Sequence, residues 1–315
     1  MKCNVAIIGA GYTAREHLKA FSDIPGVKIV GIFSRTRSKA EALAQEYKIT
    51  YVCSSVSELY EKTRADLIVV TVNELSMKSI CSDCFKFPWV SLLEKPAGFN
   101  CMEAEEILTM AREKNRKVYV ALNRRFYSST RTMVMDLINM EGDRFIRVQD
   151  QEDQHAAIEA GQPKVVVDNW MYANSIHLID YFRILGRGKI TKVSPVIHWN
   201  PDHPGNVIAT IHYDSGDVGL YEGIWNAPSP WVVNVISPKK RWELRPIEQA
   251  NFQNYGERKI TPVEPDPIDQ EFKPGFRLQA EMAVKATLGM DSEAVLLEDA
   301  TETMKLIKLI YNLDK

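Results

Sequence analysis

The segment "GAGYTA" at residues 9–14 has the spacing G-x-G-x-x-A and directly follows an apolar, β-rich run. In this arrangement Gly9 makes a tight turn, and Gly11 lets the backbone approach a pyrophosphate at the N-terminus of the next helix. We therefore expect Gly9, Gly11, Tyr12 and Thr13 to bind a dinucleotide. The alternative is a tight turn that binds no ligand.

The end of the next β-rich run, residues 27–33, carries hydroxyl and guanidinium groups and no carboxylate. An acidic residue there would bind the ribose hydroxyls of NAD. Ser34, Arg35 and Arg37 instead suit a 2′-phosphate, because guanidinium groups bind phosphate oxygens in a forked geometry. The sequence favours NADP over NAD, although Arg35 could stack on the adenine of either cofactor. An exposed basic helix start is the alternative without a ligand.

A charged pair, Glu94 and Lys95, stands directly after the apolar run at residues 89–93. Pro96 fixes the exit of the chain and favours an extended conformation at Lys95. In open α/β sheets the ligand crevice lies outside the carboxyl ends of the strands. We therefore expect Lys95 to point into the crevice that holds the nicotinamide, whereas a surface turn is the simpler alternative.

The elements that would position these residues alternate between strands and helices over residues 1–122. The β-rich runs lie at residues 3–9, 27–33, 49–53, 65–72, 89–94 and 117–122. Short connections between alternating elements imply parallel strands with right-handed crossovers. We predict an α/β fold whose N-terminal domain, residues 1–122, is a Rossmann domain with a doubly wound parallel sheet.

The pattern changes after residue 122 and predicts a second, α+β domain over residues 123–292. Longer β-rich runs lie at 144–153, 189–199, 206–225 and 231–237, and Asp-Ser-Gly at 214–216 indicates a hairpin. We expect an open, largely antiparallel sheet with a helix laid on it at about 171–185. The proline-rich stretch 261–274 is predicted to be a loop. A last helical segment, within 293–315, is expected to pack back onto the first domain.

Composition argues against several classes of partner. The 315 residues carry a formal net charge of −2, so we expect neither a nucleic-acid nor a membrane partner, and the basic stretch 239–241 is interpreted as a solvated turn. No apolar run approaches the roughly 18 residues of a membrane span, which predicts a cytoplasmic protein. Cys81 and Cys84 form a lone C-x-x-C, and we predict buried thiols and no metal site.

Several of these stretches together resemble the motifs of the Gfo/Idh/MocA oxidoreductases, the group of glucose–fructose oxidoreductase and inositol dehydrogenase. The motifs are Gly9-Ala10-Gly11, Thr71-Val72-Asn73, Glu94-Lys95-Pro96, Asn123-Arg124-Arg125-Phe126 and the H-x-x-D helix in residues 174–186. The resemblance implies hydride transfer between nicotinamide and a secondary alcohol of a sugar, cyclitol or nucleotide sugar. It also implies a homodimer or homotetramer built through the open sheet of the second domain.

The resemblance further implies roles for individual residues. Lys95 and His177 would be catalytic: Lys95 would hydrogen-bond the reacting oxygen, and His177 would be the second acid/base group. The remaining cofactor candidates are Thr71, Asn73, Glu94, Lys95 and Asn123. The substrate candidates are Lys95, Arg125, Trp170, Tyr172, Asn174, His177 and Gln279, partly because "NWMYANSIH" and "FKPGFRLQAEM" resemble stretches of relatives that act on nucleotide sugars.

Two positions depart from the family pattern. Ala173 stands where family members commonly carry an aspartate four residues before the histidine, and Ser76 replaces a frequent histidine. His177 could also be a core histidine on an amphipathic helix. Two alternatives to a dehydrogenase therefore stay open: a cofactor-retaining glycosidase or internal-redox enzyme of the same fold, and a non-catalytic dinucleotide-binding sensor.

Overall fold

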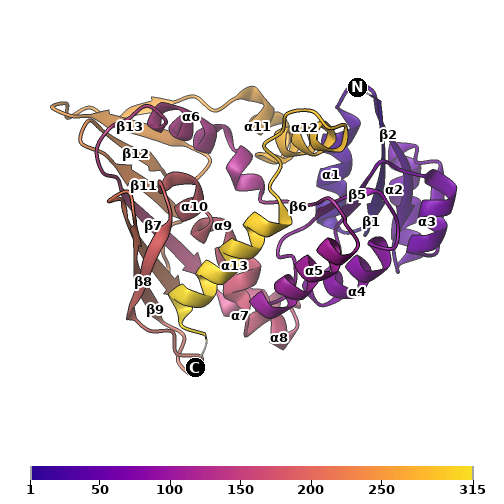
Figure 1. Ribbon diagram of the computed structural model, residues 1–315, viewed down its shortest axis with the longest axis horizontal. Coiled ribbons are helices and arrows are strands. Elements are labelled where there is room, and N and C mark those ends of the chain that lie inside the picture. Colours follow the sequence, from indigo (N-terminus) through magenta and orange to yellow (C-terminus); the bar gives the residue numbers. More distant parts are fainter. Residues whose placement is uncertain (1, 314–315) are drawn as a thin grey trace. The chain divides into compact units, whose positions relative to one another are not determined.

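The computed structural model describes residues 2–313, and six of its strands pair in parallel in the order β3-β2-β1-β4-β5-β6 (Figure 1). These strands are β1 (Cys3–Ile8), β2 (Val27–Phe33), β3 (Tyr51–Cys53), β4 (Leu67–Val70), β5 (Val90–Leu93) and β6 (Val118–Val120). All four residues of β4 are buried, as expected for a strand covered on both faces. The predicted doubly wound sheet is confirmed.

Five helices connect these strands. They are α1 (Tyr12–Ser22), α2 (Arg37–Tyr47), α3 (Val56–Thr63), α4 (Glu74–Cys84) and α5 (Cys101–Glu113). Short polar side chains begin three of them: Ser55, Asn73 and Asn100 each accept a hydrogen bond from the backbone N–H three residues later. The sequence thus marks these three helix starts locally.

The chain folds into two compact units, and the first receives a late segment of the sequence. Unit 1 comprises Met1–Phe126 with Ile268–Thr301, and unit 2 comprises Tyr127–Pro267 with Glu302–Lys315. In unit 1, α12 (Phe276–Thr287) packs on α1, and Arg277 Nε lies 2.6 Å from Asp23 Oδ2. The sequence assigned this helix to a domain spanning residues 123–292, whereas the contacts group it with the N-terminal strands.

Unit 2 contains an eight-stranded sheet in the order β14-β13-β12-β11-β7-β10-β9-β8. Its strands are β7 (Phe145–Glu152), β8 (Ile190–Ile197), β9 (Asn206–Tyr213), β10 (Val218–Trp225), β11 (Val232–Ile236), β12 (Lys240–Leu244), β13 (Ala250–Asn254) and β14 (Thr261–Val263). Only β7 and β10 pair in parallel, so the predicted antiparallel sheet is confirmed. The hairpin predicted at 214–216 joins β9 to β10.

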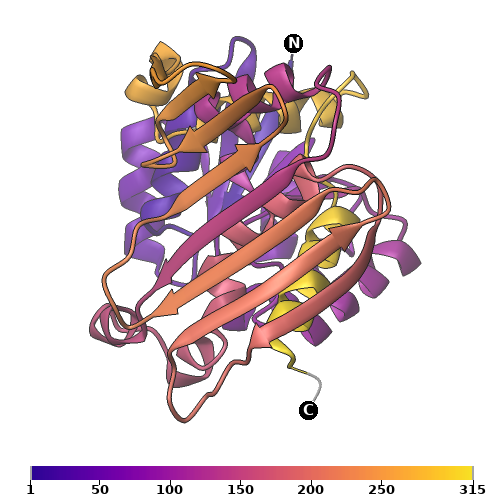
Figure 2. The ribbon, with the colours of Figure 1, turned by 90° about the vertical axis from the view of Figure 1, so that its left-hand side faces the viewer.

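One face of this sheet is covered by helices, and the other is open. Alternate residues of β7, β9 and β10 are buried. The short helices α9 (Ile176–Ile179) and α10 (Tyr181–Leu185) and the later part of α13 (Leu297–Tyr311) lie on the buried face (Figure 1). Figure 2 shows the opposite face, over which no helix of the described residues runs. The remaining helices of unit 2 are α6 (Ser128–Leu137), α7 (Gln154–Glu159) and α8 (Lys164–Val167).

Three sequence predictions need correction. The expected helix at 171–185 is interrupted: a π-turn (Met171–Ser175) precedes α9 and α10. The stretch 261–274 is not only loop, because it contains β14 and α11 (Pro267–Glu271). The turn predicted at 239–241 lies slightly earlier: an exposed bend at 238–239 joins β11 to β12. Lys240 already opens β12, where its Nζ lies 2.9 Å from Asp136 Oδ2 and 4.7 Å from the ring centroid of Phe252.

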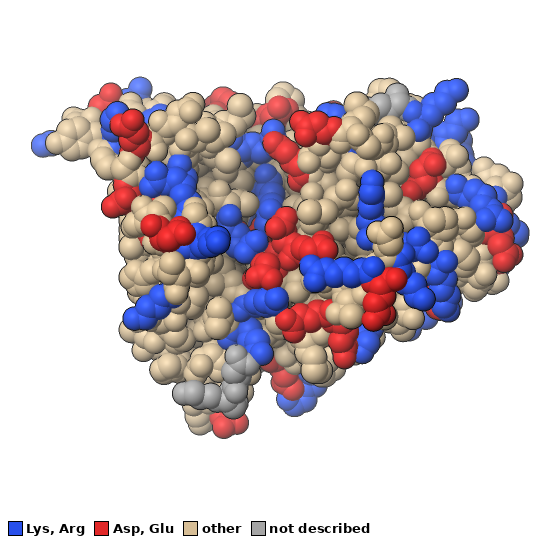
Figure 3. Space-filling model, in the orientation of Figure 1, with Lys and Arg blue, Asp and Glu red and all other residues tan. Residues whose placement is uncertain are grey.

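Charged side chains of both signs intermingle on the face shown in Figure 3, in keeping with the small net charge. None of the helices within residues 2–313 has the length and apolar character needed to cross a membrane.

Candidate functional site

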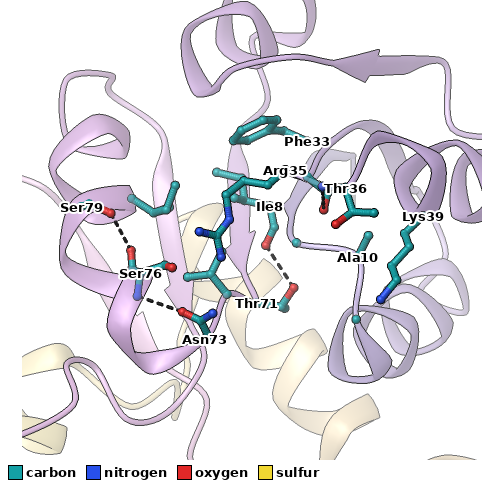
Figure 4. A pocket seen from close by; sticks show the side chains of 15 residues that line it. Ile8, Ala10, Phe33, Arg35, Thr36, Lys39, Thr71, Asn73, Ser76 and Ser79 are labelled. Atoms are coloured by element: carbon teal, nitrogen blue, oxygen red, sulfur yellow. Dashed lines mark hydrogen bonds between the residues drawn. The ribbon is translucent and has the colours of Figure 1, made fainter. Parts of the chain in front are cut away.

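A cavity of about 330 Å³ opens at the carboxyl ends of β1, β2 and β4 in unit 1 (Figure 4). Between β1 and β4 the strand order reverses, and ligands of doubly wound sheets bind at such a switch point. The lining comes from the strand ends, the glycine loop and the starts of α2 and α4: Ile8, Gly9, Ala10, Gly11, Phe33, Ser34, Arg35, Thr36, Lys39, Thr71, Val72, Asn73, Ser76, Ser79 and Ile80.

The glycine loop fits a pyrophosphate. Gly9 has a φ of 112°, and a Cβ there would lie 2.5 Å from the backbone oxygen of Thr71, so only glycine is accommodated. Gly11 begins α1, and a Cβ built on it meets no atom within 4 Å, which leaves open space above the helix N-terminus. The first turn of α1 carries no acidic side chain. Its backbone N–H groups and dipole therefore favour an anion here.

The residues after β2 form the basic end of the cavity, and one of them differs from the sequence prediction. Ser34 and Arg35 line the cavity, and in Figure 4 the Arg35 guanidinium lies between the side chains of α4 and those of Thr36 and Lys39. Arg37 does not line it: its Nε donates to Glu41 Oε1 at 2.8 Å on the surface of α2. Lys39, which the sequence reasoning missed, supplies the second cation.

Of the other cofactor candidates, some line the cavity and some lie outside it. Thr71 and Asn73 line the cavity; Thr71 Oγ1 donates to Ile8 O at 3.0 Å, and Asn73 Oδ1 accepts from Ser76 N–H at 3.0 Å as the cap of α4. Tyr12 is 67% exposed and, like Thr13, lies outside the lining. Asn123 also lies outside, where its Nδ2 donates to Pro274 O at 3.1 Å.

Glu94 and Lys95 follow β5, the neighbour of β4 in the sheet. Glu94 is 8% exposed; its Oε1 lies 2.7 Å from His17 Nε2, and its Oε2 accepts the Lys95 backbone N–H at 3.2 Å. The Lys95–Pro96 peptide bond is cis. Burial lowers the pKa of Lys95, and Glu94 and Glu74 only partly oppose this. A lysine with a lowered pKa can exchange a proton more readily near neutrality.

The substrate candidates are divided between the two units. Lys95, Arg125 and Gln279 belong to unit 1, and Gln279 is buried in α12. Trp170, Tyr172, Asn174 and His177 belong to unit 2, where Tyr172 and His177 are buried. That Lys95 and His177 face one nicotinamide stays a prediction.

One further residue of unit 2 escaped the sequence reasoning. Glu152, at the end of β7, is fully buried, and its Oε2 accepts from Asn174 Nδ2 at 2.9 Å. The signal that could have revealed it is the strand alternation, which places residue 152 on the same face as Ile146 and Val148.

The cysteines take no part in this arrangement. All five are buried thiols outside any disulfide, and burial raises the pKa values of Cys81 and Cys84 in α4. Within residues 2–313 no group of three or more histidine, cysteine or carboxylate side chains is arranged to hold a metal ion.

Comparison with known proteins identifies the N-terminal part of the chain. The model of the oxidoreductase family with the NAD-binding Rossmann fold matches residues 3–122. This segment is thus the NAD-binding Rossmann domain of the Gfo/Idh/MocA oxidoreductase family. The cavity is therefore that of a nicotinamide-dinucleotide-binding fold, as the geometry of the glycine loop indicates.

Individual Gfo/Idh/MocA relatives are distant. The chain is 24% identical over 204 residues to 4-carboxy-2-hydroxymuconate-6-semialdehyde dehydrogenase from Sphingobium sp., an alignment covering 64% of this chain and 63% of that protein. The chain thus spans less than two thirds of the length of the curated relatives it matches.

Solved structures match over nearly the whole chain. UDP-N-acetylglucosamine 3-dehydrogenase from Acidithiobacillus ferrooxidans aligns with a TM-score of 0.80 and 13% identity, covering 99% of this chain and 97% of that one. A dehydrogenase from Chromobacterium violaceum aligns with a TM-score of 0.85 and 17% identity, covering 99% and 95%. At these identities the likeness establishes the fold alone.

Proposed function

We propose that this protein transfers hydride between NADP and a secondary alcohol or ketone of a sugar, cyclitol or nucleotide sugar. The observation that carries the proposal is the position of Lys95. A lysine whose pKa is lowered follows β5, directly beside the strand whose end lines the dinucleotide cavity. Such a group beside a nicotinamide site suits proton transfer at the carbon that gains or loses hydride.

Each residue of the proposed site would have a separate role in the reaction. A bound nicotinamide dinucleotide supplies the hydride donor or acceptor. Lys95 would hydrogen-bond the oxygen of the reacting carbon and hold or release its proton. His177 would act as the second acid/base group, and Glu94 would hold the backbone of Lys95 in place.

The preference for NADP over NAD rests on the basic end of the cavity. Arg35 and Lys39 provide two cations, Ser34 and Thr36 provide hydroxyl groups, and no acidic residue lines this cavity. A 2′-phosphate would be bound by charge-assisted hydrogen bonds there. NAD would lack a carboxylate partner for its ribose hydroxyls.

The proposed substrate class rests on aromatic rings and polar side chains of the two units. Trp170 and Tyr172 offer rings that could stack on a sugar, and Arg125, Asn174 and Gln279 offer donors for hydroxyl groups. Of the structures with the same fold, one is named as a UDP-N-acetylglucosamine 3-dehydrogenase. We further propose a homodimer or homotetramer through the open face of the eight-stranded sheet, because no helix within residues 2–313 runs over that face (Figure 2).

A turnover screen tests the proposal. Purified protein is mixed with NADP or NADPH and a panel of sugars, cyclitols and nucleotide sugars, and the absorbance of reduced nicotinamide is followed. We expect a change with at least one member of the panel. Muconate semialdehydes are added because the Sphingobium relative is named for such a substrate; turnover of these alone would overturn the sugar assignment.

The same preparation separates the two alternatives. A cofactor-retaining glycosidase or internal-redox enzyme would co-purify with nicotinamide and convert substrate without net change in absorbance. A non-catalytic sensor would bind cofactor and convert nothing. The departure that motivates the sensor is Ala173, which is buried and carries no carboxylate.

A further inference from the structure

Two carboxyl groups lie in the interior of unit 2. The inward face of β7 begins with Ile146 and Val148 and continues with Asp150 and Glu152, all four fully buried. Burying a charge is strongly unfavourable unless partners compensate for the lost water. Within residues 2–313 no ion pair involves Glu152, so its compensation comes from hydrogen bonds.

Asp150 is the last acceptor in a series of hydrogen bonds that begins at Trp225. Trp225 Nε1 donates to the Tyr311 hydroxyl at 3.2 Å, and the hydroxyls of Tyr311 and Tyr221 are 2.8 Å apart. The Tyr221 hydroxyl donates to Asp150 Oδ2 at 2.9 Å. Since Tyr221 uses its proton on Asp150, Tyr311 is the donor in the contact between the two hydroxyls. This series of donors ends on Asp150 Oδ2, which accepts the last hydrogen bond.

Glu152 faces the π-turn. Its Oε1 accepts from Ser175 Oγ at 2.9 Å, and its Oε2 accepts from Asn174 Nδ2 at 2.9 Å. Burial and the charge of Asp150 raise the pKa of Glu152 well above its ordinary value, while the bonds from Asn174 and Ser175 oppose the rise. The raised pKa favours the neutral, protonated form of Glu152.

The π-turn that Glu152 contacts lies directly before α9, which carries the predicted catalytic residue His177. Asn174 and Ser175 are its last two residues, and α9, which carries His177, begins at the next position. Single π-turns within helices occur frequently at functional sites, because the extra residue re-aims the side chains that follow. Glu152, from the sheet, hydrogen-bonds the last two residues of this turn.

We propose that Glu152 is a positioning residue, which through Asn174 and Ser175 fixes the π-turn that presents Asn174 and His177 to the substrate. The proposal rests on the function proposed above for these two residues. Neutral hydrogen bonding is sufficient for this role, because the two donors, Asn174 Nδ2 and Ser175 Oγ, are themselves neutral. A glutamine at position 152 retains an acceptor oxygen for Asn174 and offers an amide donor that the Ser175 hydroxyl can accept.

The test compares Glu152→Gln and Glu152→Leu with Val148→Ala, a control on the same inward face of β7 that loses packing but no hydrogen bond to the turn. For the substrate found in the screen, Glu152→Leu is expected to lower kcat/KM by roughly 10- to 100-fold, as does the loss of a contact that orients a functional side chain. Glu152→Gln should stay within about threefold of wild type. Should Glu152→Leu fail to fold, Ser175→Ala removes one of the two bonds and should lower kcat/KM about threefold or more.

Cofactor affinity separates this proposal from the function on which it rests. NADPH titration should be unchanged in all variants, because the dinucleotide cavity lies in unit 1. If the wild-type protein converts no substrate, the proposed function fails, and the ¹⁵N-imidazole signals of His177 decide the positioning role. They should shift in Glu152→Leu and stay in place in Glu152→Gln. Unchanged signals and kinetics in Glu152→Leu, or equal losses in Glu152→Gln or Val148→Ala, would overturn the proposal.

Discussion

His17 on α1 and Glu94 at the end of β5 form a buried pair, with Nε2 and Oε1 2.7 Å apart. His17 is fully buried, and the other oxygen of Glu94 accepts the backbone N–H of Lys95. One carboxyl group therefore connects the helix that begins at the glycine loop to the segment that carries the predicted catalytic lysine. Both elements are held in register by a contact that spans 77 residues of sequence.

We predict that this pair contributes substantially to the stability of unit 1. Glu94→Ala should lower the free energy of unfolding by roughly 2–5 kcal/mol, because it leaves the imidazole of His17 buried without this partner. The double variant His17→Ala/Glu94→Ala should be less destabilised than the sum of the single variants, by about 1–3 kcal/mol. Urea unfolding of the four proteins measures this coupling.

The exposed pair Arg37–Glu41 is the matched control, since its side chains are 62% and 54% exposed. Its coupling energy should be at most about 0.5 kcal/mol. A coupling energy for His17–Glu94 that is no larger than this would show that burial does not strengthen the contact.

The cofactor preference gives a second prediction. Arg35→Ala should weaken NADPH binding by roughly 1.5–3 kcal/mol, about 10- to 150-fold, and leave NADH binding nearly unchanged, because only NADPH carries the 2′-phosphate. Lys39→Ala should act in the same direction, and Ser34→Asp should shift the preference toward NADH by repelling the phosphate. Fluorescence titration of both reduced cofactors measures these effects.

Arg37→Ala is the control for this series, because Arg37 pairs with Glu41 outside the cavity lining. Its dissociation constant for NADPH should stay within about twofold of wild type. Identical titration curves for NADPH and NADH in the wild-type protein would contradict the proposed preference, whatever the variants do.

The sequence could not predict that Lys39, and not Arg37, lines the cavity. The basic cluster after β2 is visible in the sequence, but which of its members face the cavity depends on the residue at which α2 begins. Successive helical residues are rotated by about 100°, so Arg37 points roughly 200° away from Lys39. Arg35 precedes the helix and lines the cavity together with Lys39. The helix start at Arg37 fixes this phase, and only the structure defines it.

The fold was predictable where its signals are local. Glycine spacing, apolar runs and the turn at 214–216 lie within a few residues, and they predict the parallel sheet and the hairpin correctly. The strand β12 was missed because Lys240 gains its partners, Asp136 and Phe252, from other elements. Glu152 was missed for a related reason: the polar run at 149–154 resembles a surface segment until strand pairing buries every second residue.

Lys95→Met tests the predicted chemistry. This change keeps the side-chain stem but removes the ammonium group, so turnover should fall by roughly 10²- to 10⁴-fold while NADPH affinity is retained. Steady-state kinetics with a parallel cofactor titration measures both quantities. A full rate in this variant would refute the assignment of Lys95.

The same variant has a defined effect on stability. Because the pKa of Lys95 is lowered by burial, the folded state binds fewer protons than the unfolded state between the two pKa values. The ionised lysine therefore destabilises the folded state at neutral pH, and this penalty is relieved as the pH rises through the lowered pKa. Lys95→Met should be at least as stable as wild type at pH 7, with the difference narrowing in alkaline solution. A variant that loses stability at pH 7 would contradict this sign.

The turn between β9 and β10 provides a pH-dependent prediction for unit 2. The Asp217 side chain is fully buried; its Oδ2 accepts from the backbone N–H and the Nε of Arg187 at 2.9 and 3.0 Å, and its Oδ1 accepts from Arg144 N–H at 2.9 Å. Burial alone raises the pKa of Asp217, but these donors and the Arg187 charge outweigh it and lower the pKa below its ordinary value.

A carboxyl group with a lowered pKa in the folded state stabilises the fold above its unfolded pKa, and this contribution is lost as the pH falls through the folded pKa. Asp217→Asn should therefore lower the free energy of unfolding by roughly 2–4 kcal/mol at pH 7, and the difference from wild type should shrink below about pH 4. The matched control is Asp214→Asn in the same turn, because Asp214 is exposed and an asparagine oxygen can still accept the Lys189 backbone N–H. Urea unfolding between pH 3 and pH 8 measures both variants. A difference between Asp217→Asn and wild type that stays constant over this range would show that Asp217 stabilises the turn through hydrogen bonds alone, without its charge.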